Sequence, residues 1–154
     1  MVGGGDSALQ EALHLAGYAS EIVLVTRGNG LCARQSYVSC AAENPKFSFR
    51  WETEVSEVLG GDGVEKVRLT PAGGGDGEDL DCNGVFVFVG LEPNVEFLPS
   101  EIERDGGGFV KTDSSFESGV DGVYAVGAVR AGYSGQLASA AGEAASVVAM
   151  LPMD

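Results

Sequence analysis

Apolar residues recur at helical spacing near the start of the chain and then in continuous runs of strand length. The helical spacing predicts a helix over residues 6–17 and a second over 31–42. The continuous run at 21–25 has the length and composition of a strand that is buried on both faces. A further strand is predicted over 46–51. This alternation of helices and buried strands predicts an α/β fold with a parallel sheet.

The pattern changes after residue 52 and favours an antiparallel meander. Residues 53–59 and 64–70 flank a glycine-rich turn and are predicted to form a hairpin. A short strand is expected over 80–83 and a stronger one over 85–89, ending at Gly90. A β-meander of this kind, inserted between parallel strands, would cover one face of the sheet.

The remainder of the chain is loop-rich, apart from two elements. A short strand is predicted over 123–127, and an alanine-rich helix from about 134 to 151, closed by Pro152. The small side chains of this helix suggest close packing on a sheet, yet the strands it should cover are too few. We therefore expect two domains, residues 1–90 and 91–154, the second of which is completed by another chain.

Charge and composition restrict the function classes. The 154 residues carry 23 acidic and 9 basic side chains, a net charge of −14. This charge argues against nucleic acid and against an anionic membrane as partners. No apolar run approaches the roughly 20 residues of a membrane span, and no signal-peptide pattern is found, so we expect a cytoplasmic protein. The three cysteines lack metal-ligand spacing, and no metal site is expected.

A glycine-rich turn lies at the very start of the sequence. Gly3, Gly5 and Ala8 have the G-x-G-x-x-A spacing of a dinucleotide-binding turn, with Asp6 and Ser7 between them. In such a turn the first glycine permits the tight bend, the second lets backbone approach a pyrophosphate, and the small third residue allows close packing. Such a turn normally follows a strand of about five or six residues. Here only two residues precede it, so we expect the first strand to be truncated.

Four segments carry a resemblance to a known family. They are GGGDSA at residues 3–8, NPK at 44–46, GVFVFVGLEPN at 84–94 and GVYAVG at 122–127. In this order they resemble bacterial-type thioredoxin reductases, in which an inserted NADPH domain splits an FAD domain. The resemblance implies that residues 1–90 form a Rossmann-like, three-layer NAD(P)-type domain and that 91–154 form the C-terminal segment of the FAD domain. It covers only the C-terminal half of such an enzyme, without the FAD fingerprint and the redox-active C-x-x-C.

The resemblance also indicates a nicotinamide-nucleotide site that has lost most of its phosphate-binding cations. The family binds the 2′-phosphate of NADPH with a His-Arg-Arg and a later Arg, which correspond here to Thr26, Arg27, Gly28 and Cys32. Only Arg27 is a cation. The loss of two charged phosphate contacts, each worth roughly 1.5–3 kcal/mol, predicts NADPH binding weakened more than tenfold. The alternative is that Arg27 is only a surface charge and binds no phosphate.

A second group of changed positions lies on the expected FAD edge. The family has Gly-Asp where this chain has Gly127 and Ala128, and Arg-Gln where it has Gly135 and Gln136. Ala128 cannot accept the hydrogen bond that the aspartate receives from the ribityl chain. Backbone N–H groups at the start of the last helix would still suit a flavin. The candidate FAD-binding residues are therefore Gly127, Ala128, Val129, Gly135, Gln136 and Leu137, with a purely structural helix as the alternative.

These observations lead to one functional hypothesis and two alternatives. We expect a subunit of a split, FAD-dependent oxidoreductase that is inactive alone and shares FAD with a second polypeptide, as a heterotetramer by analogy. Its substrate would be a small molecule, oxidised with weak or no use of NADPH, and no catalytic residue is identified in this chain. A non-catalytic stabilising or regulatory partner of an intact flavoprotein is one alternative. A piece of a longer reductase is the other.

Overall fold

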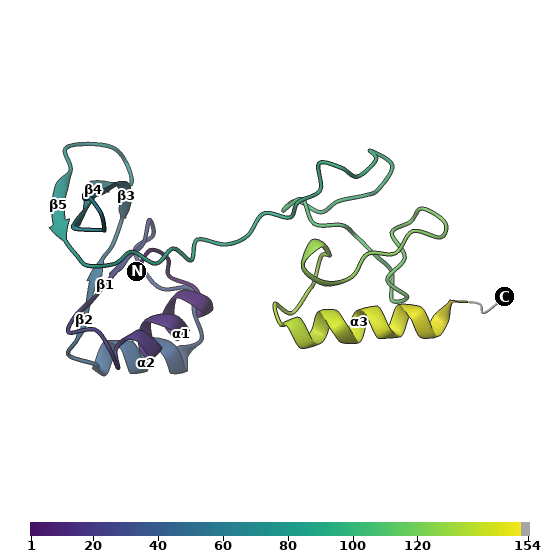
Figure 1. The fold of residues 1–154 in the computed structure, drawn as a ribbon, viewed down its shortest axis with the longest axis horizontal. Helices are drawn as coiled ribbons and strands as arrows, with labels where there is room; N and C mark the ends of the chain where they lie inside the picture. Colours follow the sequence, from purple (N-terminus) through teal and green to yellow (C-terminus); the bar gives the residue numbers. More distant parts are fainter. Residues whose placement is uncertain (152–154) are drawn as a thin grey trace. The chain divides into compact units, whose positions relative to one another are not determined.

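The computed structural model describes residues 1–151, and the chain divides into two units, Met1–Gly90 and a second that begins at Leu91 (Figure 1). In the first unit, strand β1 (Ile22–Val25) pairs in parallel with β2 (Phe47–Arg50). Val2 forms parallel bridges with both Val25 and Val87. The order across the sheet is therefore β2, β1, the segment around Val2, and the segment around Val87. The predicted α/β architecture with a parallel sheet is confirmed.

The segment around Val2 is held from both sides. The Val2 N–H donates to the Phe86 carbonyl and the Phe88 N–H donates to the Val2 carbonyl, each at 2.8 Å. The Val25 N–H donates to the carbonyl of Met1 at 2.9 Å. The prediction of a full strand over 85–89 was wrong, because only Val87 of this run forms a bridge.

Two helices, α1 (Asp6–Leu15) and α2 (Gln35–Glu43), pack together in this unit (Figure 1). Ala8 and Leu9 of α1 are completely buried in one cluster with Leu24 of β1 and Ala41 of α2. The cluster shows that the helices cover one face of the parallel sheet. Burial of such side chains stabilises the unit by about 1.5–3 kcal/mol for each large one.

Helix α2 begins four residues later than the sequence predicted. The reason is that the backbone at Cys32 is hydrogen-bonded to the glycine turn, and the helix starts only after its N-cap, Arg34. The Cys32 N–H donates to the Gly4 carbonyl at 2.8 Å, and Cys32 forms a parallel bridge with Gly5. Extended backbone at Cys32 excludes it from the helix.

The opposite face of the sheet is covered by the predicted meander, which consists of β3 (Thr53–Leu59), β4 (Lys66–Pro71) and β5 (Glu78–Asp81) in antiparallel order. Val67 and Leu69 of β4 are buried in one cluster with Val25 of β1. The hairpin prediction is confirmed. The last strand lies at 78–81 instead of 80–83, because Leu80 is opposite Val67 in the ladder.

The second unit contains a 3-10 turn, η1 (Gly127–Val129), and helix α3 (Leu137–Met150). Its buried cluster consists of Val95, Ile102 and Val110. The strand predicted over 123–127 was wrong: Tyr124 forms only an isolated antiparallel bridge with Glu117. Gly122 and Gly127 have left-handed φ values of 74° and 71°, which interrupt the extended run at both ends.

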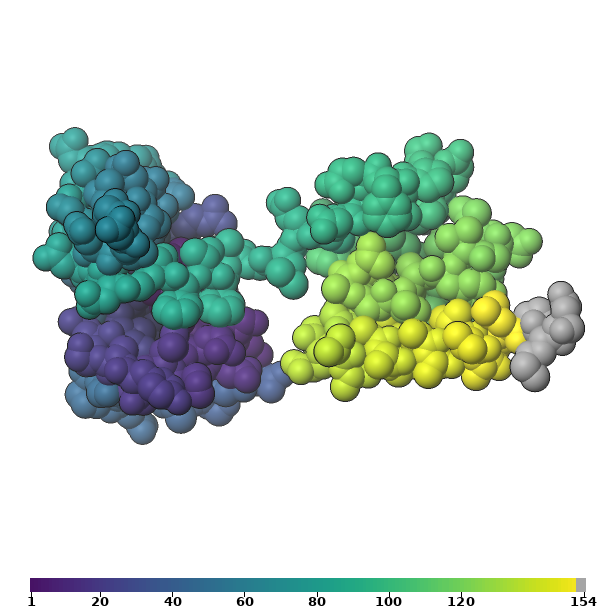
Figure 2. Space-filling model, viewed as in Figure 1, coloured from purple at the N-terminus to yellow at the C-terminus, as the bar shows by residue number. Residues whose placement is uncertain are grey.

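The helix predicted in the alanine-rich segment is confirmed as α3. Pro152, which was predicted to close it, lies outside the described residues. One stripe of the helix is apolar and exposed: Leu137, Ala138, Ala141, Ala145, Val148 and Ala149. The space-filling view shows α3 lying along the surface of its unit (Figure 2). Among residues 1–151, no helix has both the length and the apolar character needed to cross a bilayer.

Candidate functional site

The glycine turn has a different environment at each of its three small residues. Gly3 has a φ of +129°, and a Cβ there would lie 2.1 Å from the Phe88 carbonyl oxygen. At Gly5 the position of a Cβ is open, with nothing within 4 Å. Ala8, in the first turn of α1, is completely buried. The turn is therefore tight at Gly3, accessible at Gly5 and packed at Ala8, which is the geometry that a pyrophosphate-binding turn requires.

Asp6, the first residue of α1, holds the loop that follows β1. Its Oδ1 accepts a hydrogen bond from the Arg34 N–H at 2.7 Å, and its Oδ2 lies 2.9 Å from Arg34 Nε. Both side chains are largely accessible, at 40% for Asp6 and 73% for Arg34, so the ion pair itself contributes about 0–1 kcal/mol. Ser7, the next residue of α1, is exposed. Arg34 was not predicted from the sequence, although it lies only two positions after Cys32.

Arg27 lies in a turn at the carboxyl end of β1. Thr26 fixes this turn, because its N–H donates to the Arg50 carbonyl and its Oγ1 accepts from the Gly28 N–H. Thr26 is also next to the glycine turn: a Cβ on Gly4 would be 3.3 Å from Thr26 Oγ1. The structure thus brings the exposed Arg27 to the end of the sheet that carries the glycine turn. Within residues 1–151, Arg27 has no ion-pair partner.

In the second unit, a hydrogen bond to the Glu143 side chain connects η1 to α3. The Gly127 N–H donates to Glu143 Oε2 at 2.7 Å. The other carboxylate oxygen pairs with the Arg130 guanidinium, which lies 5.1 Å from the centre of the Phe116 ring. A Cβ on Gly127 would be 3.1 Å from the Ala140 Cβ, so only glycine permits this approach without displacement. Ala128 remains exposed and Val129 is half-buried.

The hydrogen bond from Arg130, followed by the backbone hydrogen bond from Gly127, lowers the pKa of Glu143 below its usual value. Neither Glu143 nor Arg130 was predicted from the sequence as a site residue. A signal was present, since Glu143 is the one charged residue in α3.

The beginning of α3 is open on the surface. Gly135 has a φ of +83°, with no atom near its Cβ position. The Gln136 carbonyl accepts hydrogen bonds from the Tyr133 hydroxyl at 2.6 Å and the Ser139 N–H at 2.9 Å. Leu137, the first helical residue, is 86% exposed. The six residues of the predicted FAD edge therefore lie in two segments, the η1 turn and the residues from Gly135 to Leu137 at which α3 begins.

The chain resembles known proteins over nearly all of its length. Residues 1–145 match the model of the pyridine nucleotide-disulphide oxidoreductase family. A thioredoxin reductase from Listeria innocua is 34% identical over 144 residues, which are 93% of this chain and 45% of that protein. One from Peptoclostridium acidaminophilum is 33% identical over 136 residues, 84% of this chain and 43% of that protein.

Solved structures give the same result. The thioredoxin reductase of Lactococcus lactis has a TM-score of 0.81 at 30% identity, covering 96% of this chain and 49% of that one. The enzyme of T. acidophilum has a TM-score of 0.79 at 27% identity, again over 96% and 49%. The chain therefore spans less than half the length of these relatives. Since the family model matches 1–145, the chain belongs to the pyridine nucleotide-disulphide oxidoreductase family, and the resemblance to thioredoxin reductases is confirmed.

Proposed function

We propose that this chain is one subunit of a split, FAD-dependent oxidoreductase and that a second polypeptide supplies the remaining parts of both nucleotide-binding domains. The first unit has the glycine turn of a nucleotide site, and the second has an accessible edge suited to a flavin. The chain's coverage of less than half of its relatives is compatible with this division. We further propose a heterotetramer with two copies of each polypeptide, in the cytoplasm.

The observation that carries the proposal is the exposed junction of η1 and α3. Glu143 fixes η1 through Gly127, and the start of α3 carries no acidic side chain in its first turn. The helix therefore presents N–H groups and the positive end of its dipole to the surface at Leu137. These groups suit the electron-rich edge of a flavin ring, whose two-electron redox chemistry the bound cofactor would supply. Ala128 offers no side-chain acceptor, so backbone groups would contribute the contacts here.

The charges beside the glycine turn favour a reaction that does not depend on NADPH. Arg27 is the one cation at the family's phosphate positions, and Arg34 is paired with Asp6. We therefore propose that a small-molecule substrate is oxidised by two electrons through the flavin. Dioxygen would receive these electrons and be reduced to hydrogen peroxide, which makes the assembly an oxidase or dehydrogenase-like enzyme.

A second candidate function follows from the same positions. Ala128 and Gly135 provide no side-chain contacts for a cofactor, which favours a non-catalytic partner that stabilises or regulates an intact flavoprotein. The two candidates differ in whether this chain touches the flavin.

A substitution at Leu137 separates them. Leu137→Pro removes one exposed N–H, and proline is well tolerated at the first position of a helix. The extended backbone at Gln136, with φ −115° and ψ 134°, also accommodates a following proline. Leu137→Ala is the matched control, because it removes the side chain and keeps the N–H.

The variants are measured in the chain co-expressed with the polypeptide of the adjacent reading frame. If the chain binds flavin, Leu137→Pro lowers the flavin absorbance per complex and Leu137→Ala does not. Equal flavin content in both variants would support the non-catalytic role. A colourless complex formed by the unsubstituted chains would refute the flavoenzyme proposal.

A further inference from the structure

The loop that precedes α2 is bonded along the glycine turn of the first unit. Cys32 forms a parallel bridge with Gly5, and its N–H donates to the Gly4 carbonyl at 2.8 Å. Two residues later, the Arg34 N–H donates to Asp6 Oδ1 at 2.7 Å. Because these contacts use main-chain atoms of residues 32 and 34, they hold Arg34 beside the turn independently of its side chain.

The Arg34 side chain lies at the amino end of α1. Its Nε is 2.9 Å from Oδ2 of Asp6, the first residue of that helix. Within residues 1–151, neither Nη1 nor Nη2 of Arg34 forms a hydrogen bond. The side chain is also 73% exposed. Asp6 therefore holds the guanidinium on its Nε side and leaves both terminal nitrogens accessible to a ligand.

The start of α1 has hydrogen-bond donors that lack acceptors. Gly5 is the N-cap and has no side chain that could accept from the first-turn N–H groups. In the part of the chain that the structure describes, the N–H groups of Ser7 and Ala8 donate to no atom. Such donors, with the positive end of the helix dipole, suit a phosphate. The Asp6 carboxylate would repel a phosphate there, and the charge of Arg34 offsets that repulsion.

Arg27 and Arg34 are placed at different parts of the site. Arg27 follows β1 and occupies one of the family's 2′-phosphate positions. Arg34 occupies none of these positions, and its side chain is held at the start of α1. There the backbone at Gly5 is open, since a Cβ on it would meet no atom within 4 Å. Guanidinium makes charge-assisted, bidentate hydrogen bonds to phosphate, so Arg34 suits a diphosphate at the open turn.

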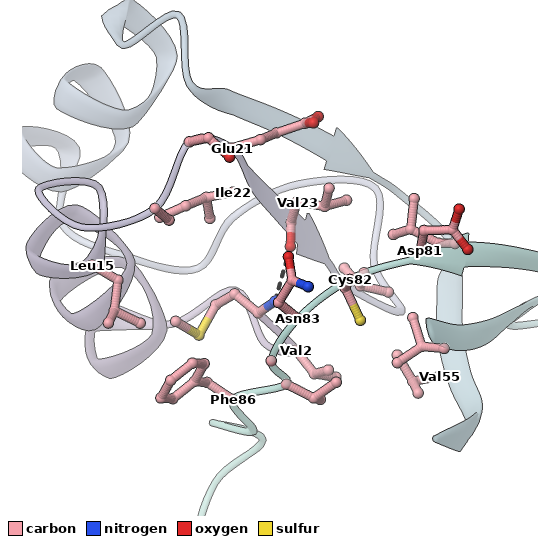
Figure 3. Close-up of a pocket in the computed structure, with 18 of the residues that line it drawn as sticks. Val2, Leu15, Glu21, Ile22, Val23, Val55, Asp81, Cys82, Asn83 and Phe86 are labelled. Carbon is pink, nitrogen blue, oxygen red and sulfur yellow. Dashed lines mark hydrogen bonds between the residues drawn. The ribbon is translucent and has the colours of Figure 1, made fainter. Parts of the chain in front are cut away.

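The first unit also has a cavity of about 550 Å³, which has a different character (Figure 3). Val23 of β1, Val55 of β3 and Phe86 are among its mostly apolar lining residues. The lining includes the carboxylates of Glu21 and Asp81, but no described arginine or lysine side chain. This cavity therefore lacks the side-chain cations that recognise a diphosphate, and it does not include the glycine turn.

We propose that Arg34, held at the start of α1 by Asp6, binds the diphosphate of a nucleotide at the glycine turn. The ligand class is a nucleoside diphosphate, free or as part of a dinucleotide. The inference concerns the first unit alone and goes beyond the proposed split flavoenzyme, because it requires neither a flavin nor a second polypeptide.

The first experiment compares the two arginines by calorimetric titration of the full chain with ADP. We expect Arg34→Gln to weaken ADP binding by roughly tenfold or more, because one charge-assisted phosphate contact is lost. Arg27→Gln is the matched control and should change the Kd for ADP by less than about threefold. Equal losses in the two variants would overturn the inference, as would the absence of ADP binding by the unsubstituted chain.

A parallel titration with NADH identifies the source of the diphosphate. Tighter binding of NADH than of ADP indicates a dinucleotide, and equal affinities indicate a free nucleoside diphosphate. In either case the loss caused by Arg34→Gln should be the same for both ligands. A loss for NADH without one for ADP would contradict a diphosphate contact.

The second experiment asks whether Arg34 contacts phosphate or only neutralises Asp6. Asp6→Asn removes the negative charge and keeps Oδ1 as an acceptor for the N–H of residue 34. We expect the double variant Asp6→Asn, Arg34→Gln to bind ADP at least roughly fivefold more weakly than the unsubstituted chain. Restoration of the original affinity in the double variant would overturn the inference, because neutralisation alone would then explain the effect of Arg34.

Folding of these variants is checked by circular dichroism melts. Since the main-chain contacts of residues 32 and 34 remain, Arg34→Gln and Arg27→Gln should have equal Tm values. The flavin content of the complex is a separate readout, so failure of the diphosphate site would leave the proposed flavoenzyme intact.

Discussion

Glu143 accepts a hydrogen bond from the backbone N–H of Gly127, although the two residues are sixteen positions apart in the sequence. This contact fixes η1 on α3, and the Arg130 guanidinium holds the same carboxylate from the other side. One acidic side chain thus determines the shape of the candidate flavin edge.

The lowered pKa of Glu143 predicts a pH dependence of stability. Because the pKa is lower in the folded state than in the unfolded state, the contribution is fully present above the usual value of 4.5. It is lost as the pH falls through the lowered pKa of the folded state. We expect Glu143→Gln to decrease the Tm of the second unit at pH 7 and to flatten its Tm profile between pH 5 and 3. Circular dichroism melts across this range test the prediction, and parallel profiles for the two proteins would contradict it.

Gly3 and Gly5 form a matched pair within one turn. Gly3→Ala places a Cβ against the Phe88 carbonyl in a left-handed conformation, and we expect a loss of at least about 2 kcal/mol in the free energy of unfolding. Gly5→Ala enters open space, so its cost is no more than about 1 kcal/mol. Urea denaturation of both variants measures the difference. Similar losses would show that the turn is not packed as described.

Leu9 is the large side chain at the centre of the helix-side core. It is completely buried, and Leu9→Ala is expected to lower the free energy of unfolding by about 2–5 kcal/mol. Gln10→Ala, at an exposed position on the same helix, serves as control and should change it by less than about 0.5 kcal/mol. Denaturant titration gives both values, and a loss below 1 kcal/mol for Leu9→Ala would be inconsistent with its burial.

The weak NADPH binding that we propose predicts that an added cation strengthens it. Gly28 has space for a side chain, since the nearest atom to its Cβ position, the Gly30 carbonyl oxygen, is 3.8 Å away. Gly28→Arg adds a guanidinium next to Arg27, and a charged phosphate contact of roughly 1.5–3 kcal/mol would tighten NADPH binding at least tenfold. Gly28→Glu is the charge-reversed control. Calorimetric titration with NADPH and NADH tests this, and an equal gain for NADH would exclude the 2′-phosphate as the cause.

The elements that the sequence predicted correctly are those whose local pattern agrees with their tertiary partners. The run at 21–25 became β1, and the alanine-rich segment became α3, because burial or helix propensity acts along the whole element. Residues 31–34 were misassigned, since a hydrogen bond from Cys32 to Gly4, 28 positions away, decides their conformation. No local pattern contains that contact.

In the candidate sites, too, local features were predicted from the sequence and contacts between distant segments were not. The roles of Gly3 and Ala8 in the turn follow from spacing alone, whereas the pairing of Asp6 with Arg34 and of Glu143 with Gly127 depends on packing between distant segments. The run at 123–127 has strand-like side chains, but the left-handed glycines at its ends determine its shape.

The bare apolar stripe of α3 has a consequence for handling the protein. At low ionic strength the net charge of −14 keeps separate molecules apart by mutual repulsion. At 0.1 M, added salt screens that repulsion beyond about 10 Å but does not cover the apolar stripe. A preparation of this chain alone should therefore become turbid as the buffer is made more saline, the opposite of what salting-in would produce.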